Sequence, residues 1–547
     1  MEKPLVICST LLIETSPQSL PLGAACIASS IKSDPRTKDK VRVVLRDASK
    51  EDNLSVKKFK EKFLDGEVPD FFLVSVYVWN RVELEAVALE IKKEYPSCIT
   101  ICGGPEVTAN PLSFEKSFDY ITTGPGEDVV PDLISKILEE KIDGLSKIIK
   151  ANPQKNEILN LKSPYLDGTL DPAKYGGALW ELARGCPFKC SYCFESKGEN
   201  NISYFPMERI KAELDLFAEK KIPQVFVLDP TYNADKKRAM EILNLISQKT
   251  PDTFYYFEAR AEFIDRELAR AFTKIPCALQ FGLQSADENV LRLVHRGFNK
   301  KVFVKNVGIL NQEGVIFGFD LIYGLPGDTF KGFKQSMDFA LNLYPNNLET
   351  FCLSVLPGTV LFDEAEKLNL HYETEAPYHV LYTDKYSKED LKLSSELSLS
   401  CALFYNIGRA VPWFISFVRF FNNQPHNFLQ KFIKWYEKVY KNSILTCSFC
   451  SDADYFEVQK MQLAFLKDLC REKHCENVFR VLEDIVILNG AFSVNSSTGK
   501  SQKVQLKYHP DDLLSEYALD PMFFLKNAKP YRCTVLVQNG DYRLVKN

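Results

Sequence analysis

The sequence predicts an α/β protein built from two consecutive parallel-sheet domains and a mostly α-helical C-terminal region. Apolar strand-like runs alternate with amphipathic helical patterns in two series, one over residues 1–140 and one over residues 176–384. Strict alternation of strand and helix is typical of parallel sheets covered by helices. After about residue 385 the alternation stops and helical patterns dominate. With 547 residues, the chain is also too long for a single hydrophobic core.

The first series predicts a doubly wound, Rossmann- or flavodoxin-like domain. Its strands are expected at residues 4–9, 41–47, 71–79, 98–106 and 118–127. The third strand is nearly all apolar, as a strand covered on both faces should be. Such sheets bind ligands beyond the carboxyl ends of their strands, where the glycine turns at 103–104 and 124–126 are expected to lie.

The second series predicts a partial (β/α)6 TIM barrel, whose chemistry should take place at the C-terminal ends of its strands. The strands are expected at about 178–183, 224–229, 254–260, 278–284, 316–322 and 350–356. Residues 141–175, rich in Lys, Asn and Pro, are expected to form a linker that crosses the surface. Residues 385–547 should form the helical region, which ends in a hairpin around the Asn-Gly pair at 539–540.

Charge and composition exclude several classes of function. The net charge of -4 gives no basic excess for binding DNA or long RNA. The N-terminus lacks the pattern of a signal peptide, and fifteen cysteines in so long a chain favour a reducing cytoplasm over a disulfide framework. No apolar stretch is long enough to span a membrane. The apolar run at 410–421 is expected to be a buried helix, with contact to a membrane surface or a lipid substrate as the alternative.

Three cysteines fall within eight residues in the stretch RGCPFKCSYCFE, which directly follows the first strand of the second series: Cys186, Cys190 and Cys193. Thiolates suit zinc or iron–sulfur clusters, and structural zinc sites usually close with four protein ligands. The next cysteine is Cys277 and the first histidine is His295. Three ligands leave one metal position open for a substrate or cofactor. Idle thiols, or a zinc site completed from far away, are the alternatives.

This CxxxCxxC spacing, with Tyr192 before the last cysteine, closely resembles the radical S-adenosylmethionine (SAM) superfamily. The resemblance implies that the cysteines hold a [4Fe-4S] cluster and that its unique iron binds the amino and carboxylate groups of SAM. One electron from the cluster then yields a 5'-deoxyadenosyl radical, a species that requires a walled, dry cavity.

The resemblance also implies SAM contacts on the strand-end loops. The expected contacts are Tyr192, Asp229, Glu258, Arg260, Gln284 and Ser285. Arg260 could hold the SAM carboxylate by a two-point contact. Many relatives carry Glu at the position of Gln284, and each polar residue taken alone fits a role in the barrel rim equally well.

A doubly wound domain in front of such a barrel resembles the cobalamin-binding subgroup of the superfamily. The stretches that carry the resemblance are SLPLGAACIA, VSVYVWN, CGGPEVTANP and TTGPGED, between residues 19 and 128. The expected cobalamin contacts are Ser75, Val76, Tyr77, Gly103, Gly104, Pro105, Glu106, Thr108, Gly124, Gly126 and Glu127. Gly103 and Gly104 should let a bulky planar cofactor approach the backbone closely. Residues 1–294 contain no histidine, so this domain offers cobalt no imidazole ligand.

Four further cysteines lie near the C-terminus: Cys447, Cys450, Cys470 and Cys475. A second metal site is conceivable there. A spacing of five residues on a helix would point the thiols of Cys470 and Cys475 away from each other, which favours ordinary core or surface thiols.

The resulting hypothesis is a cytoplasmic, cobalamin-dependent radical SAM enzyme that methylates an unactivated carbon of a small molecule. A flavodoxin- or ferredoxin-type protein would supply electrons. The alternatives are a radical rearrangement, cyclisation or oxidation without methyl transfer, and a non-catalytic cofactor-binding sensor. A methylthio-transferring enzyme is disfavoured, because the first domain lacks a suitable cysteine triad.

Overall fold

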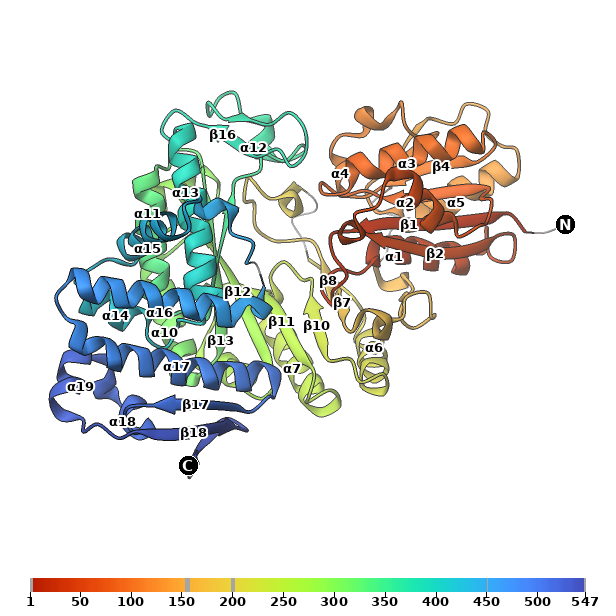
Figure 1. Ribbon diagram of the computed structural model, residues 1–547. Helices are drawn as coiled ribbons and strands as arrows, with labels where there is room; N and C mark the ends of the chain where they lie inside the picture. Colours follow the sequence, from red (N-terminus) through yellow and green to blue (C-terminus); the bar gives the residue numbers. More distant parts are fainter. Residues whose placement is uncertain (1–2, 153–157, 198–201, 450, 546–547) are drawn as a thin grey trace.

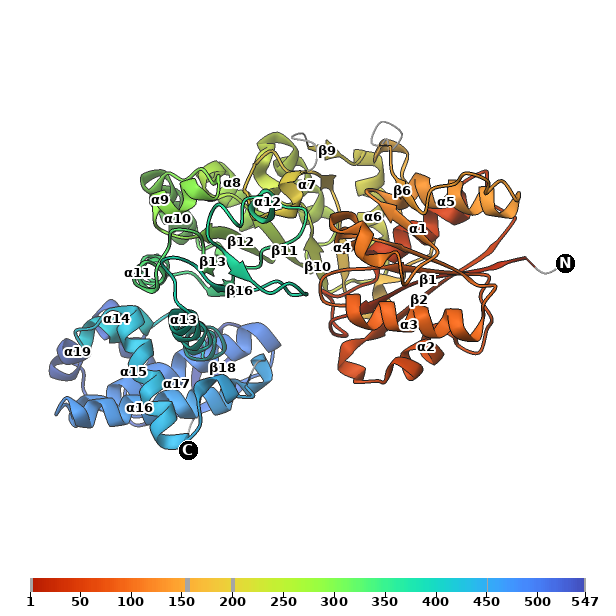
Figure 2. The ribbon, with the colours of Figure 1, turned by 90° about the horizontal axis from the view of Figure 1, so that it is seen from above.

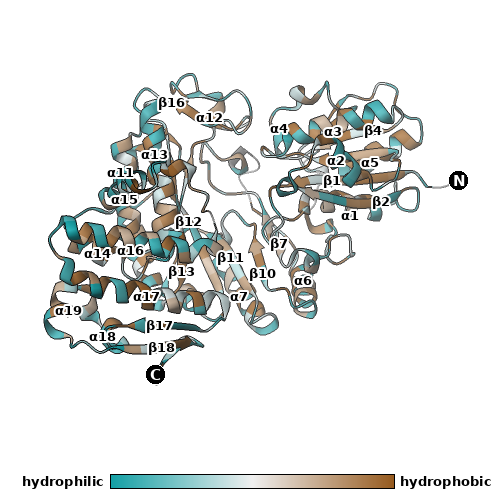
Figure 3. Cartoon of the chain, viewed as in Figure 1, coloured by the Kyte–Doolittle hydropathy of each residue, from teal (hydrophilic) through white to brown (hydrophobic). Residues whose placement is uncertain are grey.

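The protein has three parts that follow one another along the chain, as the ribbon of the computed structural model shows (Figure 1). The structure describes residues 3–152, 158–197, 202–449 and 451–545. Two six-stranded parallel sheets lie in the first two parts, and the C-terminal part is mainly helical. Hydrophobic residues are concentrated along the strands of both sheets (Figure 3).

The first sheet has the order β2-β1-β3-β4-β5-β6, and all of its strand pairs are parallel. Its strands are β1 (Leu5–Leu12), β2 (Arg42–Ser49), β3 (Phe71–Ser75), β4 (Ile99–Gly103), β5 (Tyr120–Thr123) and β6 (Ile148–Lys150). One core lies under α1 (Leu22–Ser33) and α5 (Gly126–Leu138), and another under α2 (Val56–Leu64) and α3 (Arg81–Glu94). The predicted doubly wound sheet is therefore confirmed.

The segment 141–175 is not the surface linker that its composition suggested. β6 pairs with β5 and extends the first sheet to Lys150. Farther along, Tyr165, Leu170 and Tyr175 are buried in the core of the second part. The Tyr165 hydroxyl donates a hydrogen bond to the Leu179 carbonyl at 2.6 Å. The prediction failed because widely spaced apolar residues between lysines and asparagines give no periodic pattern.

The second sheet has the order β14-β13-β12-β11-β10-β7 and is also parallel throughout, which confirms the predicted six-stranded partial barrel. Its strands are β7 (Ala178–Trp180), β10 (Gln224–Val227), β11 (Phe254–Ala259), β12 (Cys277–Gln284), β13 (Ile316–Tyr323) and β14 (Asn347–Cys352). Helices α7 (Lys236–Lys249), α8 (Arg266–Phe272) and α10 (Lys300–Glu313) lie on one side of it (Figure 2). On β11 and β12, residues facing the helices are buried and alternate with more exposed ones, so the opposite face is open.

The C-terminal part is a helical layer that ends in a small sheet. Its main helices are α13 (Lys388–Cys401), α14 (Phe414–Phe420), α15 (Pro425–Tyr440), α16 (Tyr455–Glu472) and α17 (Glu476–Thr498). The buried side chains of α14 confirm the buried helix predicted at 410–421. The predicted hairpin is formed by β18 (Cys533–Gln538) and β19 (Asp541–Val545), and β17 (Gln502–Leu506) joins it as a third strand that was not predicted. Within the described ranges, no helix is long and apolar enough to cross a bilayer.

Candidate functional site

The three clustered cysteines lie on one loop beyond the first strand of the barrel. The loop follows β8 (Ala183–Arg184), and Gly185 opens it with a φ of 89°, a conformation that favours glycine. Within the loop, the Cys193 amide donates to the Cys190 carbonyl at 3.1 Å. Ser191 fixes the loop to the barrel, since its amide donates to Val294 and its carbonyl accepts from Leu361. The loop is therefore held in place by backbone hydrogen bonds on both sides.

Burial and one nearby arginine define the environment of these thiols. Burial raises the pKa of the Cys193 thiol to about 11, and the nearby Cys190 and Cys186 add to this rise. The Arg296 guanidinium lies 3.7 Å from the Cys190 sulfur and 3.3 Å from the Tyr192 hydroxyl. Arg296 thus places a positive charge directly beside the cysteine loop.

Within the described part of the chain, no three His, Cys, Asp or Glu side chains are gathered tightly enough to hold a metal ion. The three thiols nevertheless share one loop and interact electrostatically. Binding of a metal group would draw them together, since metal binding and local folding are coupled. The donor set of three soft thiolates fits an iron–sulfur cluster.

Arg296 was missed by the sequence analysis and proves central to the loop. Besides its contacts to the cysteine loop, it donates a hydrogen bond to the Gly282 carbonyl of β12. No pattern marks it, because it lies on a turn after α9 (Glu288–Leu293), more than a hundred residues from the cysteines that it contacts.

Arg260 and Asp229 are both buried beside the cysteine loop, but in different roles. The Arg260 guanidinium lies 4.3 Å from the ring centre of Phe188, a residue of the loop, and pairs with Glu262 at 3.0 Å. Asp229 accepts from the amides of Leu182 and Ala183 at 2.8 and 2.9 Å, and burial raises its pKa to about 7. Arg260 could therefore reach a ligand at the loop, whereas Asp229 fastens the strand end that leads into it.

The two predicted contacts at the end of β12 also differ. Gln284 has a φ of 67°, and its buried side-chain oxygen has no hydrogen-bond partner among the residues that the structure describes. A strained backbone and an unpaired buried acceptor are typical of a ligand site. The Ser285 hydroxyl, in contrast, bonds to Ser336 and to the Asp287 amide, so its hydrogen bonds are internal.

A cavity of about 1020 Å³ lies between the first sheet and the cysteine loop. All of the predicted cobalamin contacts except Val76 and Glu106 line it. Its other wall includes Arg184 and Gly185 before Cys186, and Phe194 and Glu195 after Cys193. The volume is at the upper end for sites that bind small molecules and cofactors, roughly 300–1,000 Å³. The carboxyl ends of the first sheet and the cysteine loop therefore share one chamber.

Glu106 does not line the cavity, and the two glycines also permit close packing within the domain. Glu106 is buried and bonds to Arg81 at 3.0 Å and to Tyr378, so it joins two parts of the chain. A Cβ added to Gly104 would lie 2.5 Å from the Val76 carbonyl oxygen, and one added to Gly103 would lie 2.6 Å from the Thr122 hydroxyl. These glycines thus permit close packing within the domain, although both still line the cavity.

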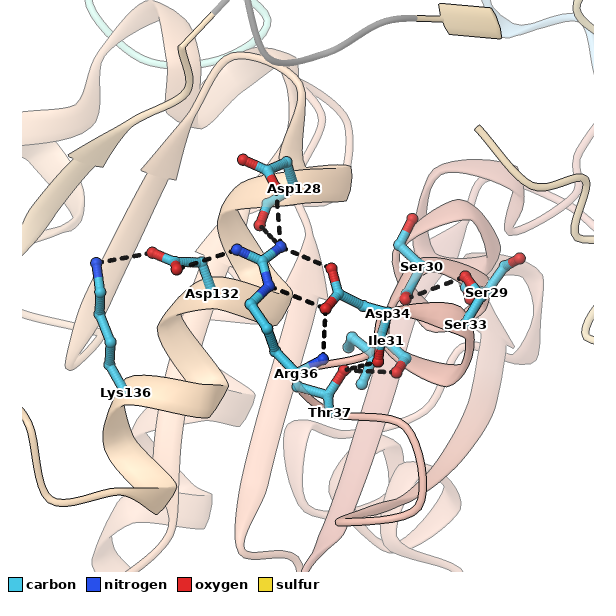
Figure 4. A network of polar contacts seen from close by, with 10 residues as sticks. All are labelled: Ser29, Ser30, Ile31, Ser33, Asp34, Arg36, Thr37, Asp128, Asp132 and Lys136. Carbon is cyan, nitrogen blue, oxygen red and sulfur yellow. Dashed lines mark hydrogen bonds and ion pairs between the residues drawn. The ribbon is translucent and has the colours of Figure 1, made fainter. Parts of the chain in front are cut away.

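Helix α5 brings Glu127 to the boundary between the two domains. Glu127 forms an ion pair with Arg184 of the barrel at 2.7 Å. The helix itself is fixed to the end of α1 by Arg36, whose guanidinium bonds to Asp34, Asp128 and Asp132 (Figure 4). This anchor holds the first turn of α5, and with it the cavity wall, in a fixed position.

Of the four C-terminal cysteines, Cys470 and Cys475 lie differently from the expectation. The expectation that Cys470 and Cys475 point apart is wrong, because the two thiols lie close enough to influence each other's pKa. α16 ends at Glu472, and the chain then turns through His474, which has a φ of 53°. The assumption of a continuous helix therefore failed. Cys450 lies outside the described residues.

Comparisons with known proteins agree with this architecture. Residues 180–340 match the model of the Radical SAM superfamily. A relative named "Cobalamin-dependent radical SAM methyltransferase TokK", from Streptomyces tokunonensis, is 26% identical over 339 residues, which cover 55% of this chain and 49% of that protein. The chain thus spans about half the length of this curated relative.

Two solved structures have a similar fold. One is OxsB, a cobalamin-dependent SAM radical enzyme solved with aqua-cobalamin and SAM bound, with a TM-score of 0.59, 14% identity and coverage of 87% of this chain and 81% of that one. The other is the radical SAM methyltransferase TsrM from Kitasatospora setae, solved with cobalamin and a [4Fe-4S] cluster, with a TM-score of 0.53, 15% identity and coverage of 70% and 83%. Residues 180–340 of the chain thus match the Radical SAM superfamily, and the overall fold is similar to those of OxsB and TsrM.

Proposed function

We propose that the chain is a cobalamin-dependent radical SAM enzyme that transfers a methyl group to an unactivated carbon of a small molecule. The observation that carries this proposal is the shared chamber, which the carboxyl ends of the first sheet and the cysteine loop both enclose. The name of the relative, a cobalamin-dependent methyltransferase, supports it.

In this proposal each part of the chain has a separate task. Residues up to 150 bind cobalamin through the loops after β3, β4 and β5, and residues 176–384 bind SAM and the cluster. Cys186, Cys190 and Cys193 are the cluster ligands, and Arg296 balances their charge. When bound, SAM on the reduced cluster supplies a hydrogen-abstracting radical, and cobalamin carries the methyl group.

The geometry best supports three SAM contacts, namely Tyr192, Arg260 and Gln284. Tyr192 belongs to the cysteine loop and Arg260 contacts it, whereas the buried side-chain oxygen of Gln284 is unpaired among the described residues. The residues that line the chamber include no histidine, so its walls would offer a bound cobalt no imidazole ligand. An electron donor of the flavodoxin or ferredoxin type supplies the electrons. The enzyme works in the cytoplasm, where thiols stay reduced.

The experiment is anaerobic turnover with SAM, cobalamin and a chemical reductant. Formation of both 5'-deoxyadenosine and S-adenosylhomocysteine with an accepted substrate supports methyl transfer. Formation of 5'-deoxyadenosine alone with an accepted substrate assigns the chain to rearrangement, cyclisation or oxidation instead. A Cys190→Ala variant should make neither product, whereas the control Cys533→Ala, a half-buried cysteine of β18, should make both.

A further inference from the structure

A second cavity, of about 550 Å³, lies on the open face of the barrel sheet. It is lined by residues of β10 to β13 and the start of β14, together with Pro17 and Gln18 of the first domain. Gln18 and Leu228 line both this cavity and the chamber between the domains. The two spaces therefore adjoin, and a molecule in the second lies beside the space assigned above to the cofactors.

One wall of the second cavity is aromatic. Phe226 on β10 and Tyr256 on β11 are register partners, and their rings stack with centroids 4.3 Å apart and planes inclined by only 3°. Tyr256 is 37% exposed and Leu228 is 41% exposed, which leaves apolar surface open on this face. Flat apolar surfaces of this kind pack against rings or alkyl groups and attract cations over their faces.

The charged part of the cavity lining is negative. Glu258 lies on the same face as Tyr256, one row along the sheet, and it has no hydrogen bond or ion pair to any residue that the structure describes. Its register partner Gln280 donates to Asp320 at 2.7 Å, so the amide is already engaged. No lysine, arginine or histidine is among the residues that line this cavity.

The next row of the sheet adds more negative charge. Asp320 pairs in register with Glu349, whose negative charge adds to the rise that burial causes in the pKa of Asp320. The positive group facing Asp320 is Arg296, whose hydrogen bonds go to Gly282 and the cysteine loop. An acid with like-charged neighbours and no counter-ion is costly to ionise, unless a ligand brings the missing positive charge.

We propose that this second cavity is the substrate pocket of the enzyme and that it selects a molecule with an apolar body and a cationic amino group. The apolar body packs against Phe226 and Tyr256, and the ammonium group pairs with Glu258. This assigns Glu258 to the substrate rather than to SAM, and it rests on the proposed function for the nature of the reaction. An anionic substrate would meet the Glu258 carboxylate and no basic side chain in the lining, with Asp320 and Glu349 in the next row of the sheet.

The test compares two probes of the same shape and opposite charge, phenethylammonium and hydrocinnamate, on the full-length protein by calorimetry under anaerobic conditions. Phenethylammonium should bind about tenfold more tightly than hydrocinnamate. Glu258→Gln should weaken phenethylammonium binding about tenfold and leave hydrocinnamate binding unchanged or stronger. The control Glu241→Gln, an exposed acid on α7, should change neither.

Equal or tighter binding of hydrocinnamate to the wild-type protein would overturn the proposal, and this comparison needs no variant to fold. Unchanged phenethylammonium binding in Glu258→Gln, with the melting temperature preserved, would also overturn it. The test reads binding and not turnover. A protein that prefers phenethylammonium but binds no cobalamin therefore refutes the proposed function and not the pocket, while a protein with both cofactors and no preference for the cation refutes the pocket alone.

Discussion

The hydroxyl of Tyr378 donates a hydrogen bond to Glu106 of the first domain. Tyr378 lies in the segment between the barrel and the C-terminal helices. Arg81 completes the contact, because its guanidinium lies 3.0 Å from Glu106 and 3.2 Å from the Tyr378 oxygen. Burial raises the pKa of Tyr378, and Glu106 adds to the rise, so the phenol stays neutral and remains a donor. Three side chains thus join segments almost three hundred residues apart along the chain.

Tyr378→Phe should lower the free energy of unfolding by about 1–3 kcal/mol, because it leaves a buried carboxylate with one donor fewer. Denaturant titration at pH 7 measures this, with Tyr344→Phe, an exposed tyrosine, as the control. If both variants unfold at the same denaturant concentration as the wild type, the contact contributes nothing to stability.

Gly104→Ala should destabilise the first domain by about 3 kcal/mol or more, because the residue has a φ of 112° and the new methyl group would meet the Val76 backbone. Gly66→Ala is the matched control: it has a φ of 79° and open space around it, and should cost only about 1 kcal/mol. Chemical denaturation of the two variants compares them. Similar losses in both would mean that close packing on Val76 does not constrain this turn.

Arg184→Met should weaken cobalamin binding about tenfold, because it leaves Glu127 and Glu181 without their shared counter-ion at the wall of the chamber. Absorbance titration with hydroxocobalamin measures the affinity. Arg42→Met removes a more exposed ion pair with Glu67, neither residue of which lines the chamber, and should leave the affinity unchanged. Equal affinity in all three proteins would place cobalamin away from this wall.

Binding of phenethylammonium should strengthen as the pH rises from 6 to about 8 and then level off. Burial raises the pKa of Glu258 to about 8, and Asp320, whose own pKa is raised to about 6, adds to the rise. Only the ionised carboxylate pairs with the cation, so affinity follows its deprotonation; Glu349 and Arg296 are the other charged groups on this face. Calorimetry across this range in the wild type and in Glu258→Gln checks the result, and a pH profile shared by both proteins would contradict it.

The raised pKa of Glu258 has the opposite effect on stability, because the free energy of unfolding falls as the pH rises. An acid whose pKa is raised by folding favours the folded state while it is protonated, so stability falls as the pH rises from the unfolded value of about 4.3 towards 8. Glu258→Gln should lose less stability over this interval than the wild type. Thermal melts at pH 5 and pH 8 measure the difference, and identical pH slopes would contradict the assignment.

Much of the architecture follows from local patterns. The eleven strands expected in the two sheets all appear, because each is a short apolar run bounded by glycine or polar turns. β6 was missed because three residues give too short a pattern, and the burial of Tyr165 and Leu170 depends on contacts that only the folded chain makes. The cysteines and most of the chamber residues could be identified because motifs mark them.

Residues that act through long-range contacts left no signal in the sequence. Arg296 reaches the cysteine loop from a turn after α9, and Tyr378 reaches Glu106 from beyond the barrel. Glu106 was expected in the cofactor site because it lies in the stretch CGGPEVTANP, which resembles the cobalamin-binding subgroup, but on the short helix α4 (Pro105–Ala109) it contacts Tyr378 instead.

The most direct test of the account is electron paramagnetic resonance of the anaerobically reconstituted, reduced protein, recorded with and without SAM. The account predicts the signal of a reduced four-iron cluster, and a clear change in that signal when SAM is added, because three cysteine ligands leave one iron free to bind it. A missing cluster signal, or one that SAM leaves unchanged, would contradict the assignment of Cys186, Cys190 and Cys193 and the function built on it.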